Sequence, residues 1–266
     1  MTRRRMPAAP WIAAVAIATL LLLSFKHFDT TTQNLTNRFA APSRDYLLGT
    51  DHLGRDTFAR LLAGAKYSVG LAVVLSVACA AFGTSIGVLA GWLGGTLGAG
   101  VDRIVDSLVA IPAIIFGLVL TAVMGPGIGA VVVAVSIAGW TPYARMARNL
   151  SRTALGSEYA LAAMAYGQSG WPLLYKHIVP NIRGPLVTLM CMRCADVIFL
   201  IGGLSFLGIG IQLPIPEWGA MIADARPYLT HAPQLLIYPA VGLVTVVVAL
   251  SVIGRNLQKG EHRHGF

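Results

Sequence analysis

Two charged side chains, Arg193 and Asp196, interrupt a long apolar stretch of the sequence between Pro185 and Ile209. A charge near the middle of a membrane-spanning helix costs about 2.5 to 3.5 kcal/mol on insertion scales, so such residues are rare. A spacing of three residues puts both side chains on one face of a helix, where they can neutralise each other. The pair therefore has two interpretations: it lines a polar path through a membrane, or it is an interior ion pair that stabilises a helical bundle.

Other reactive side chains favour structural roles. Asp51 and Asp56 could ligate a metal, but turn capping and an ion pair with Arg55 explain them better, and no calcium-loop pattern accompanies them. Cys191 and Cys194 have the C-x-x-C spacing of redox motifs. Apolar surroundings disfavour a thiolate, so we expect both to be small buried side chains.

The sequence offers no site for nucleotide hydrolysis. A phosphate-binding loop needs Gly-x-x-x-x-Gly-Lys-Ser/Thr, and Gly64-Ala65-Lys66 lacks both the upstream glycine and the hydroxyl residue. No Ser/His/Asp set, zinc-binding helix or pair of catalytic carboxylates is visible either. We expect a non-enzymatic chain with no catalytic residue, no metal site and no cofactor of its own.

The composition is that of a membrane protein, with 56% hydrophobic and 12% charged residues, where soluble domains carry about 25% charged residues. A spanning helix needs about 20 apolar residues, and about six such stretches can be placed. The stretches expected to span are Pro10 to Phe25 (an uncleaved anchor), Tyr67 to Leu93, Ile104 to Met124, Ile128 to Tyr143, Pro185 to Ile209 and Gln234 to Gly254.

The placement of charge argues for a membrane topology rather than for nucleic-acid binding. With both termini in the cytoplasm, most arginines and lysines fall on the cytoplasmic side, which is the positive-inside pattern; the outer loop from Lys26 to Lys66 breaks it. Trp218 and Tyr228, in the second outer loop, suit the interfacial aromatic belt. The resulting divisions are an N-terminal tip and first span at 1–28, an outer loop with an amphipathic helix at 29–66, a transmembrane core at 67–254 that includes a cytoplasmic loop at 144–184, and a cytoplasmic tail at 255–266.

The second and third expected spans carry packing signals. Gly83, Gly87, Gly91 and Gly95 repeat every four residues and predict very close helix contact in lipid. The third span is expected to open with the acids Asp102 and Asp106 near its N-terminus. Pro112 then removes a backbone hydrogen bond and predicts a kink, which makes it a candidate hinge or simply a packing feature.

A long polar interruption between strongly apolar stretches runs from Glu158 to Asn181. Ser157 is a plausible N-cap, and Gly167 can take the left-handed conformation that ends a first short helix. A second short helix follows and should stop at Pro180. The first helix is expected to present a face formed by Tyr159, Ala162, Ala163 and Tyr166, whose small centre would suit a groove on another protein, although an ordinary cytoplasmic hairpin fits the pattern equally well.

This segment resembles the coupling motif of binding-protein-dependent ATP-binding cassette (ABC) importers, Glu-Ala-Ala, three residues, Gly, nine residues, Ile-x-Leu-Pro. Ala162, Ala163, Gly167 and Pro180 fall on the motif at the right spacing. Leu161 stands where the motif has Glu, and His177 where it has Ile. The variant Glu-Tyr-x-x-Ala-Ala with His-Ile-x-Pro-Asn, together with Leu48 to Asp56 and Leu204 to Gly210, is similar to the dipeptide, oligopeptide and nickel branch of the family, second-permease type.

The resemblance implies an all-α permease of the type I importer class in the bacterial cytoplasmic membrane. The partners implied are a second homologous permease in a heterodimer, one or two ATPase subunits that carry ATP and Mg, an extracytoplasmic solute-binding protein and the lipid bilayer. The residues implied to couple transport to the ATPases are Glu158, Tyr159, Ala162, Ala163, Gly167, His177 and Pro180.

The cargo stays open at this point. The family branch favours di- or oligopeptides, with nickel, a metal chelate or haem as alternatives. Relatives often carry a Glu where this chain has Ile201, which leaves a family-derived charged pathway in question. A different class, an ion-coupled secondary transporter using Asp106 and Asp196, lacks the paired broken spans typical of such folds.

Overall fold

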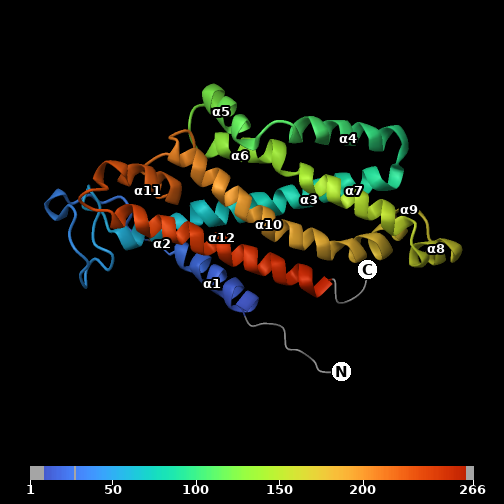
Figure 1. The fold of residues 1–266 in the computed structure, drawn as a ribbon, viewed down its shortest axis with the longest axis horizontal. Coiled ribbons are helices and arrows are strands. Elements are labelled where there is room, and N and C mark those ends of the chain that lie inside the picture. The colour runs from blue at the N-terminus through green and yellow to red at the C-terminus, as the bar shows by residue number, and fades with distance from the viewer. Residues whose placement is uncertain (1–8, 27, 262–266) are drawn as a thin grey trace.

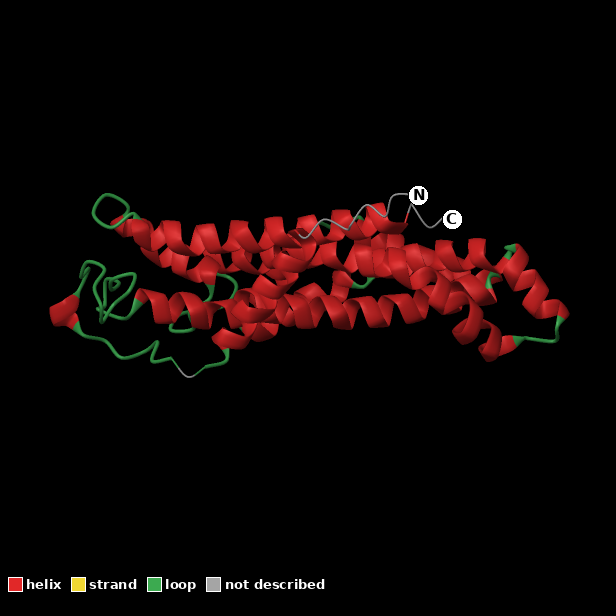
Figure 2. Ribbon diagram, turned by 90° about the horizontal axis from the view of Figure 1, so that it is seen from below, coloured by secondary structure: helices red, strands yellow, loops and turns green. Residues whose placement is uncertain are grey.

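The computed structural model describes residues 9–26 and 28–261, and in that part of the chain the regular secondary structure is helical apart from one β-bridge between Thr50 and Asp56. The helices form an elongated bundle, with loops gathered at its two ends (Figures 1 and 2). The prediction of an all-α membrane protein is confirmed. The helices are α1 (Ala9–Ser24), α2 (Thr57–Ala65), α3 (Leu71–Leu93), α4 (Gly95–Val109), α5 (Ala113–Met124), α6 (Ile128–Gly139), α7 (Thr141–Leu155), α8 (Glu158–Ala165), α9 (Gly170–Leu173), α10 (Val179–Phe206), α11 (Trp218–Ala225) and α12 (Gln234–Glu261). The tip around Arg3 to Arg5 and the tail from 262 onward lie outside the described residues.

The membrane-spanning helices agree roughly with the predicted set. Four helical stretches are long and apolar enough to cross a membrane, and α4 with α5 adds a fifth if this bent pair is one span. Helix α1 is a shorter apolar helix at the place of the expected first span. The four long stretches are Thr57–Leu93, Ile128–Leu155, Gly170–Phe206 and Gln234–Lys259.

The amphipathic helix expected in the outer loop is α2, and it is the beginning of the second span. It continues through a π-helical turn, Lys66–Gly70, into α3. Asp56 caps it by accepting hydrogen bonds from the backbone amides of Phe58 and Ala59. Its inner face is buried against the chain's own bundle, with Arg60 only 2% exposed.

The third span differs from the prediction at its start. Gly94 and Gly95 both have positive φ angles, 59° and 53°, and turn the chain directly from α3 into α4. Helix α4 therefore begins at Gly95, and Asp102 and Asp106 lie in its second half rather than at a helix N-terminus. Helices α4 and α5 meet at 77°, with Pro112 at the N-cap of α5, so the expected kink is a full break.

Three of the four spaced glycines place α3 against α7, as predicted. A Cβ atom on Gly83 would lie 2.2 Å from the carbonyl oxygen of Trp140, and one on Gly87 would lie 2.3 Å from that of Ala144. Gly91 meets Arg148 in the same way, at 2.8 Å. The contacts ascend together along both helices, so α3 and α7 run parallel with their backbones in near contact. Gly95 has no neighbour within 4 Å and belongs to the turn, so its place in the series is wrong.

Helix α11 lies at the end of the bundle opposite α8 (Figure 1). The side chain of Glu217 is fully buried and accepts hydrogen bonds from the Ser68 hydroxyl and the Ala220 amide, each at 2.8 Å. The indole of Trp218 is 1% exposed and donates to the carbonyl oxygen of Leu61 at 2.8 Å. The expectation that Trp218 sits in an interfacial belt is wrong, because its ring packs in the main hydrophobic core.

Candidate functional site

The segment from Glu158 to Asn181 lies at one end of the bundle, where α8 and α9 project beyond the long helices (Figure 1). As predicted, two short helices flank a glycine, and Gly167 has a φ angle of 82°. Its amide donates to the carbonyl oxygen of Met164 at 2.9 Å, which closes the end of α8. Ser157 occupies the N-cap position of α8, but its hydroxyl donates back to the carbonyl of Ala154 instead of capping the helix.

Helix α8 has an inner and an outer side. Ala160 and Ala163 are buried against the chain's own helices, at 0% and 8% exposure. Tyr159, Ala162 and Tyr166 are exposed. The predicted face with two alanines at its centre is therefore divided, with Ala162 facing outward and Ala163 facing the bundle.

The inner side of α8 packs against α7 and against the helical turn Leu174–Ile178 that precedes α10. Ala160 belongs to a buried cluster with Val88 of α3, Ala147 of α7 and Ile182 of α10. Helix α9 adds a ring contact between Trp171 and Trp92 of α3, with centroids 5.9 Å apart. Helix α8 therefore contacts α7 and the turn before α10 directly, and it reaches α3 through the shared cluster and the Trp171–Trp92 contact of α9.

Pro180 does not end the helix that contains it. A π-helical turn, Leu174–Ile178, leads straight into α10, whose second residue is Pro180. The stretch Gly170–Phe206 is thus one helical segment of 37 residues, about 55 Å long at 1.5 Å per residue. It exceeds a hydrocarbon layer of about 30 Å, so it can hold α8 clear of the bilayer. Glu158 and Pro180 are exposed and His177 is half-buried.

Two ion pairs fasten α4 to α7 near the same end. Arg148 pairs with Asp102, and Arg145 pairs with Asp106. These acids were predicted only as helix-dipole partners, and the two pairs were not predicted. The signal was present, since the acids are spaced i, i+4 and the arginines i, i+3, each set on one helix face.

Arg193 and Asp196 lie midway along α10, far from α8. The two side chains form an ion pair, with Nη1 of Arg193 3.3 Å from Oδ2 of Asp196, and they remain 46% and 65% exposed on this chain. They line a groove of about 400 Å³ walled by α3, α5, α6, α7 and α10. Ala113, the first residue of α5, also lines it, which places the groove beside the break at Pro112.

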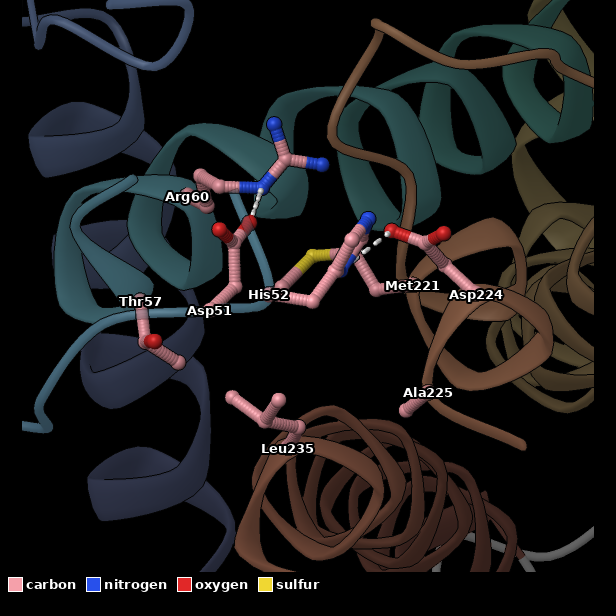
Figure 3. Close-up of a pocket in the computed structure, with 8 residues that line it drawn as sticks. All are labelled: Asp51, His52, Thr57, Arg60, Met221, Asp224, Ala225 and Leu235. Carbon is pink, nitrogen blue, oxygen red and sulfur yellow. Dashed lines mark ion pairs between the residues drawn. The ribbon is translucent and has the colours of Figure 1, made fainter. Parts of the chain in front are cut away.

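A second charged cluster lies at the opposite end, beside α11 (Figure 3). The Asp51 carboxylate accepts from Nε of Arg55 at 2.6 Å and lies 3.6 Å from Nε of Arg60. Asp224 of α11 lies 3.3 Å from Nη2 of Arg55 and 3.7 Å from Nδ1 of His52. The Asp51–Arg55 pair was expected. The contacts made by Arg60 and Asp224 were not, and Arg55 and Asp224 lie 169 positions apart along the chain, where no local pattern links them. The cluster pins the outer loop onto α11.

The described residues hold no group of three or more His, Cys, Asp or Glu side chains arranged to bind a metal ion. Cys79 and Cys194 are buried free thiols, and Cys191 is half-buried and also free. The C-x-x-C spacing thus belongs to one face of a packed helix.

Comparison with known proteins agrees with this architecture. Residues 83–260 match the family model described as binding-protein-dependent transport system inner membrane component. Over 263 residues the chain is 33% identical to the oligopeptide transport system permease protein OppC of Bacillus subtilis, covering 97% of this chain and 86% of that protein. Over 244 residues it is 31% identical to the dipeptide transport system permease protein DppC of Alkalihalophilus pseudofirmus, covering 92% and 79%.

A third relative is named for the transport of a different solute. The glutathione transport system permease protein GsiD of Pectobacterium atrosepticum is 36% identical over 217 residues, which cover 82% of this chain and 72% of that protein. The family match includes α8, Arg193 and Asp196, and all of α11; of the residues that line the groove, only Ser76 and Cys79 precede it. The chain therefore belongs to the family of binding-protein-dependent transport system inner membrane components, the multi-pass permease subunits of ABC importers.

Proposed function

We propose that this chain forms half of the translocation path for di- or oligopeptides in an ABC importer and couples that path to ATPase subunits through α8. The observation that carries the proposal is the two-sided packing of α8. Its inner side is buried against α7 and the turn Leu174–Ile178 that leads into α10, while Ala162 and its exposed neighbours lie on the other side at the end of the bundle. A helix so placed can sit in a groove of another protein and pass its movement to the spans.

The energy of transport would come from the ATPase partners, which carry ATP and Mg. Closure of two ATPase subunits would move the α8 helices, and the bundle would shift between an inward-open and an outward-open state. Such a shift is driven by the difference in ATP affinity between the two states. The break at Pro112 lies beside the groove and is the proposed hinge.

A second homologous permease is the proposed partner within the membrane. The groove that contains Arg193 and Asp196 is open on this chain, and charges exposed to lipid near mid-membrane are costly. Helix α5 also exposes a set of large apolar side chains close to the groove: Ile114, Ile115, Leu118, Val119 and Val123. A homologous chain over this side would enclose the path between two permeases.

The proposed orientation puts α8 in the cytoplasm and α11 outside. Helix α1 begins and α12 ends toward the α8 end of the bundle (Figure 1), which makes both termini cytoplasmic. The cytoplasmic end then holds Arg145, Arg148 and Arg152 of α7, as the positive-inside rule favours. A solute-binding protein would deliver its cargo at the α11 end.

Two relatives are named for oligopeptide and dipeptide transport, which supports a peptide cargo for this chain. The test is uptake of a radiolabelled dipeptide by cells that carry the complete transporter, with this chain deleted and then restored. We expect uptake to require the chain and a working ATPase subunit and to survive a protonophore. Nickel uptake in place of dipeptide uptake would favour the metal-chelate alternative, and loss of uptake with the protonophore alone would favour an ion-coupled transporter.

The coupling itself can be tested by a disulfide crosslink. Ala162→Cys, in a chain whose three native cysteines are replaced by alanine, should crosslink to a single cysteine in the ATPase groove, and the yield should change when nucleotide is trapped. Ala160→Cys is the matched control, because this position is fully buried against the chain's own helices. Equal yields from both positions would contradict the assignment of the outer face.

A further inference from the structure

The groove beside α10 combines features that would suit a zwitterion, a ligand with one positive end, one negative end and no net charge. Arg193 and Asp196 offer one positive and one negative group on the same wall. The rest of the lining is largely apolar, and it includes Val135 of α6 and Leu200 of α10. A volume of about 400 Å³ lies in the range of pockets that hold small organic ligands, about 300 to 1,000 Å³.

The groove also contains a polar group with no partner. Tyr143 of α7 lines it and is 1% exposed, and within residues 9–26 and 28–261 its hydroxyl has no hydrogen-bond partner. A buried hydroxyl without a partner is unfavourable, and such groups in native structures call for an explanation. The hydroxyl oxygen is itself buried, so a ligand carbonyl oxygen supplies the missing acceptor once a rotation of the tyrosine ring turns the hydroxyl toward the groove.

We propose that this groove binds the two charged ends of a short peptide: Arg193 takes the terminal carboxylate, Asp196 takes the terminal ammonium group, and the Tyr143 hydroxyl donates to a backbone carbonyl. The inference rests on the proposed function and deepens it by naming the groups that hold the cargo. In the empty groove the two side chains neutralise each other at 3.3 Å. In the loaded groove each charge exchanges its partner for one end of the ligand.

The exchange keeps the groove electrically neutral with and without ligand. This neutrality is the physical basis of a selectivity for peptides whose two ends are free. A zwitterion brings one positive and one negative group, so neither side chain is left unpaired. A peptide capped at one end leaves either Arg193 or Asp196 without a partner in a low-dielectric site, where an unpaired charge is costly. An extended dipeptide spans about 7 Å, a length that the long arginine side chain can accommodate once its contact with Asp196 opens.

The test uses the purified complex of permeases and ATPases without the solute-binding protein, so that the selectivity of the binding protein does not enter. The probe is a dipeptide of alanine and benzoylphenylalanine with free ends, photocrosslinked to the complex and mapped by mass spectrometry. We expect crosslinks on α7 or α10. Arg193→Gln, Asp196→Asn and Tyr143→Phe should each lower the yield, by about tenfold or more for the two charged positions. Val187→Thr, at an exposed position of α10 outside the groove, should leave it unchanged.

The double variant separates a binding role from a purely structural ion pair. If Arg193 and Asp196 only stabilise the bundle, removing both charges should restore crosslinking and uptake that either single change impairs. If they bind the ligand ends, Arg193→Gln with Asp196→Asn should label at least as poorly as either single variant, when yield is counted per folded complex.

Capped probes provide a measurement on the unmodified protein, which needs no variant to fold. N-acetylated and C-amidated forms of the dipeptide should compete with the photoprobe at least tenfold less well than the free form. Equal competition by capped and free dipeptides, or recovery in the double variant, would overturn the inference while leaving peptide transport intact. Failure of the unmodified transporter to take up any dipeptide would instead overturn the proposed function.

Discussion

Bulk added to the outer side of α8 should block transport without unfolding the chain. Ala162 is exposed, so Ala162→Trp places its ring in solvent when the chain is alone. Surface substitutions of this kind usually change stability by no more than about 0.5 kcal/mol. A partner groove that fits a methyl group would have to admit an indole, and overpacking costs about 1 to 3 kcal/mol. That cost lowers the docking constant by about 5- to 150-fold.

The assay compares three variants in cells that carry the complete transporter, with dipeptide uptake divided by the amount of chain in the membrane. Ala162→Ser keeps the side chain small and should transport normally. Ala160→Trp forces an indole into a fully buried site within the cluster that α8 shares with α7 and the turn before α10, so it should lower the amount of chain. Normal uptake by Ala162→Trp, or equal loss in Ala162→Ser, would refute the argument that α8 docks through its exposed side.

Three further changes probe the fold. Gly87→Val should sharply reduce the amount of chain in the membrane, because its Cβ would lie 2.3 Å from a carbonyl oxygen of α7. Gly100→Val is the control and should not, because a Cβ there has no neighbour within 4 Å. Equal levels of the two variants on an immunoblot would argue against backbone contact. Asp51→Asn leaves buried Arg60 without its carboxylate and buried Arg55 with Asp224 alone, and it should destabilise the outer end by about 3 to 5 kcal/mol. The loss should appear as a lower melting temperature in detergent, while exposed Asp45→Asn serves as the control and should not shift it. Gly167→Ala should weaken the α8 turn by about 1 to 2 kcal/mol, because its φ angle is 82° and its surroundings are open, with Gly167→Asn better tolerated; similar melting temperatures for both would exclude backbone strain as the cause.

Much of the architecture follows from local sequence. Apolar stretches long enough to span lipid predicted the helices and, with the charges, a topology. The glycines of α3 predicted its close contact, because a missing Cβ allows backbones to approach wherever the partner lies. Asp56 was predicted as a cap and Gly167 as a turn, since both effects depend on the residue and its immediate neighbours.

Only the tertiary structure decided how these elements are used. It placed Ala163 inward and Ala162 outward on α8, because helical spacing gives the relative angle of two side chains but not which side meets the bundle. It joined the outer loop to α11 through Asp51, Arg55 and Asp224, and it buried Trp218 in the core instead of at the membrane interface. Local patterns fix where a helix begins and which residues share its face; the partner of that face is set by packing between segments far apart in the chain.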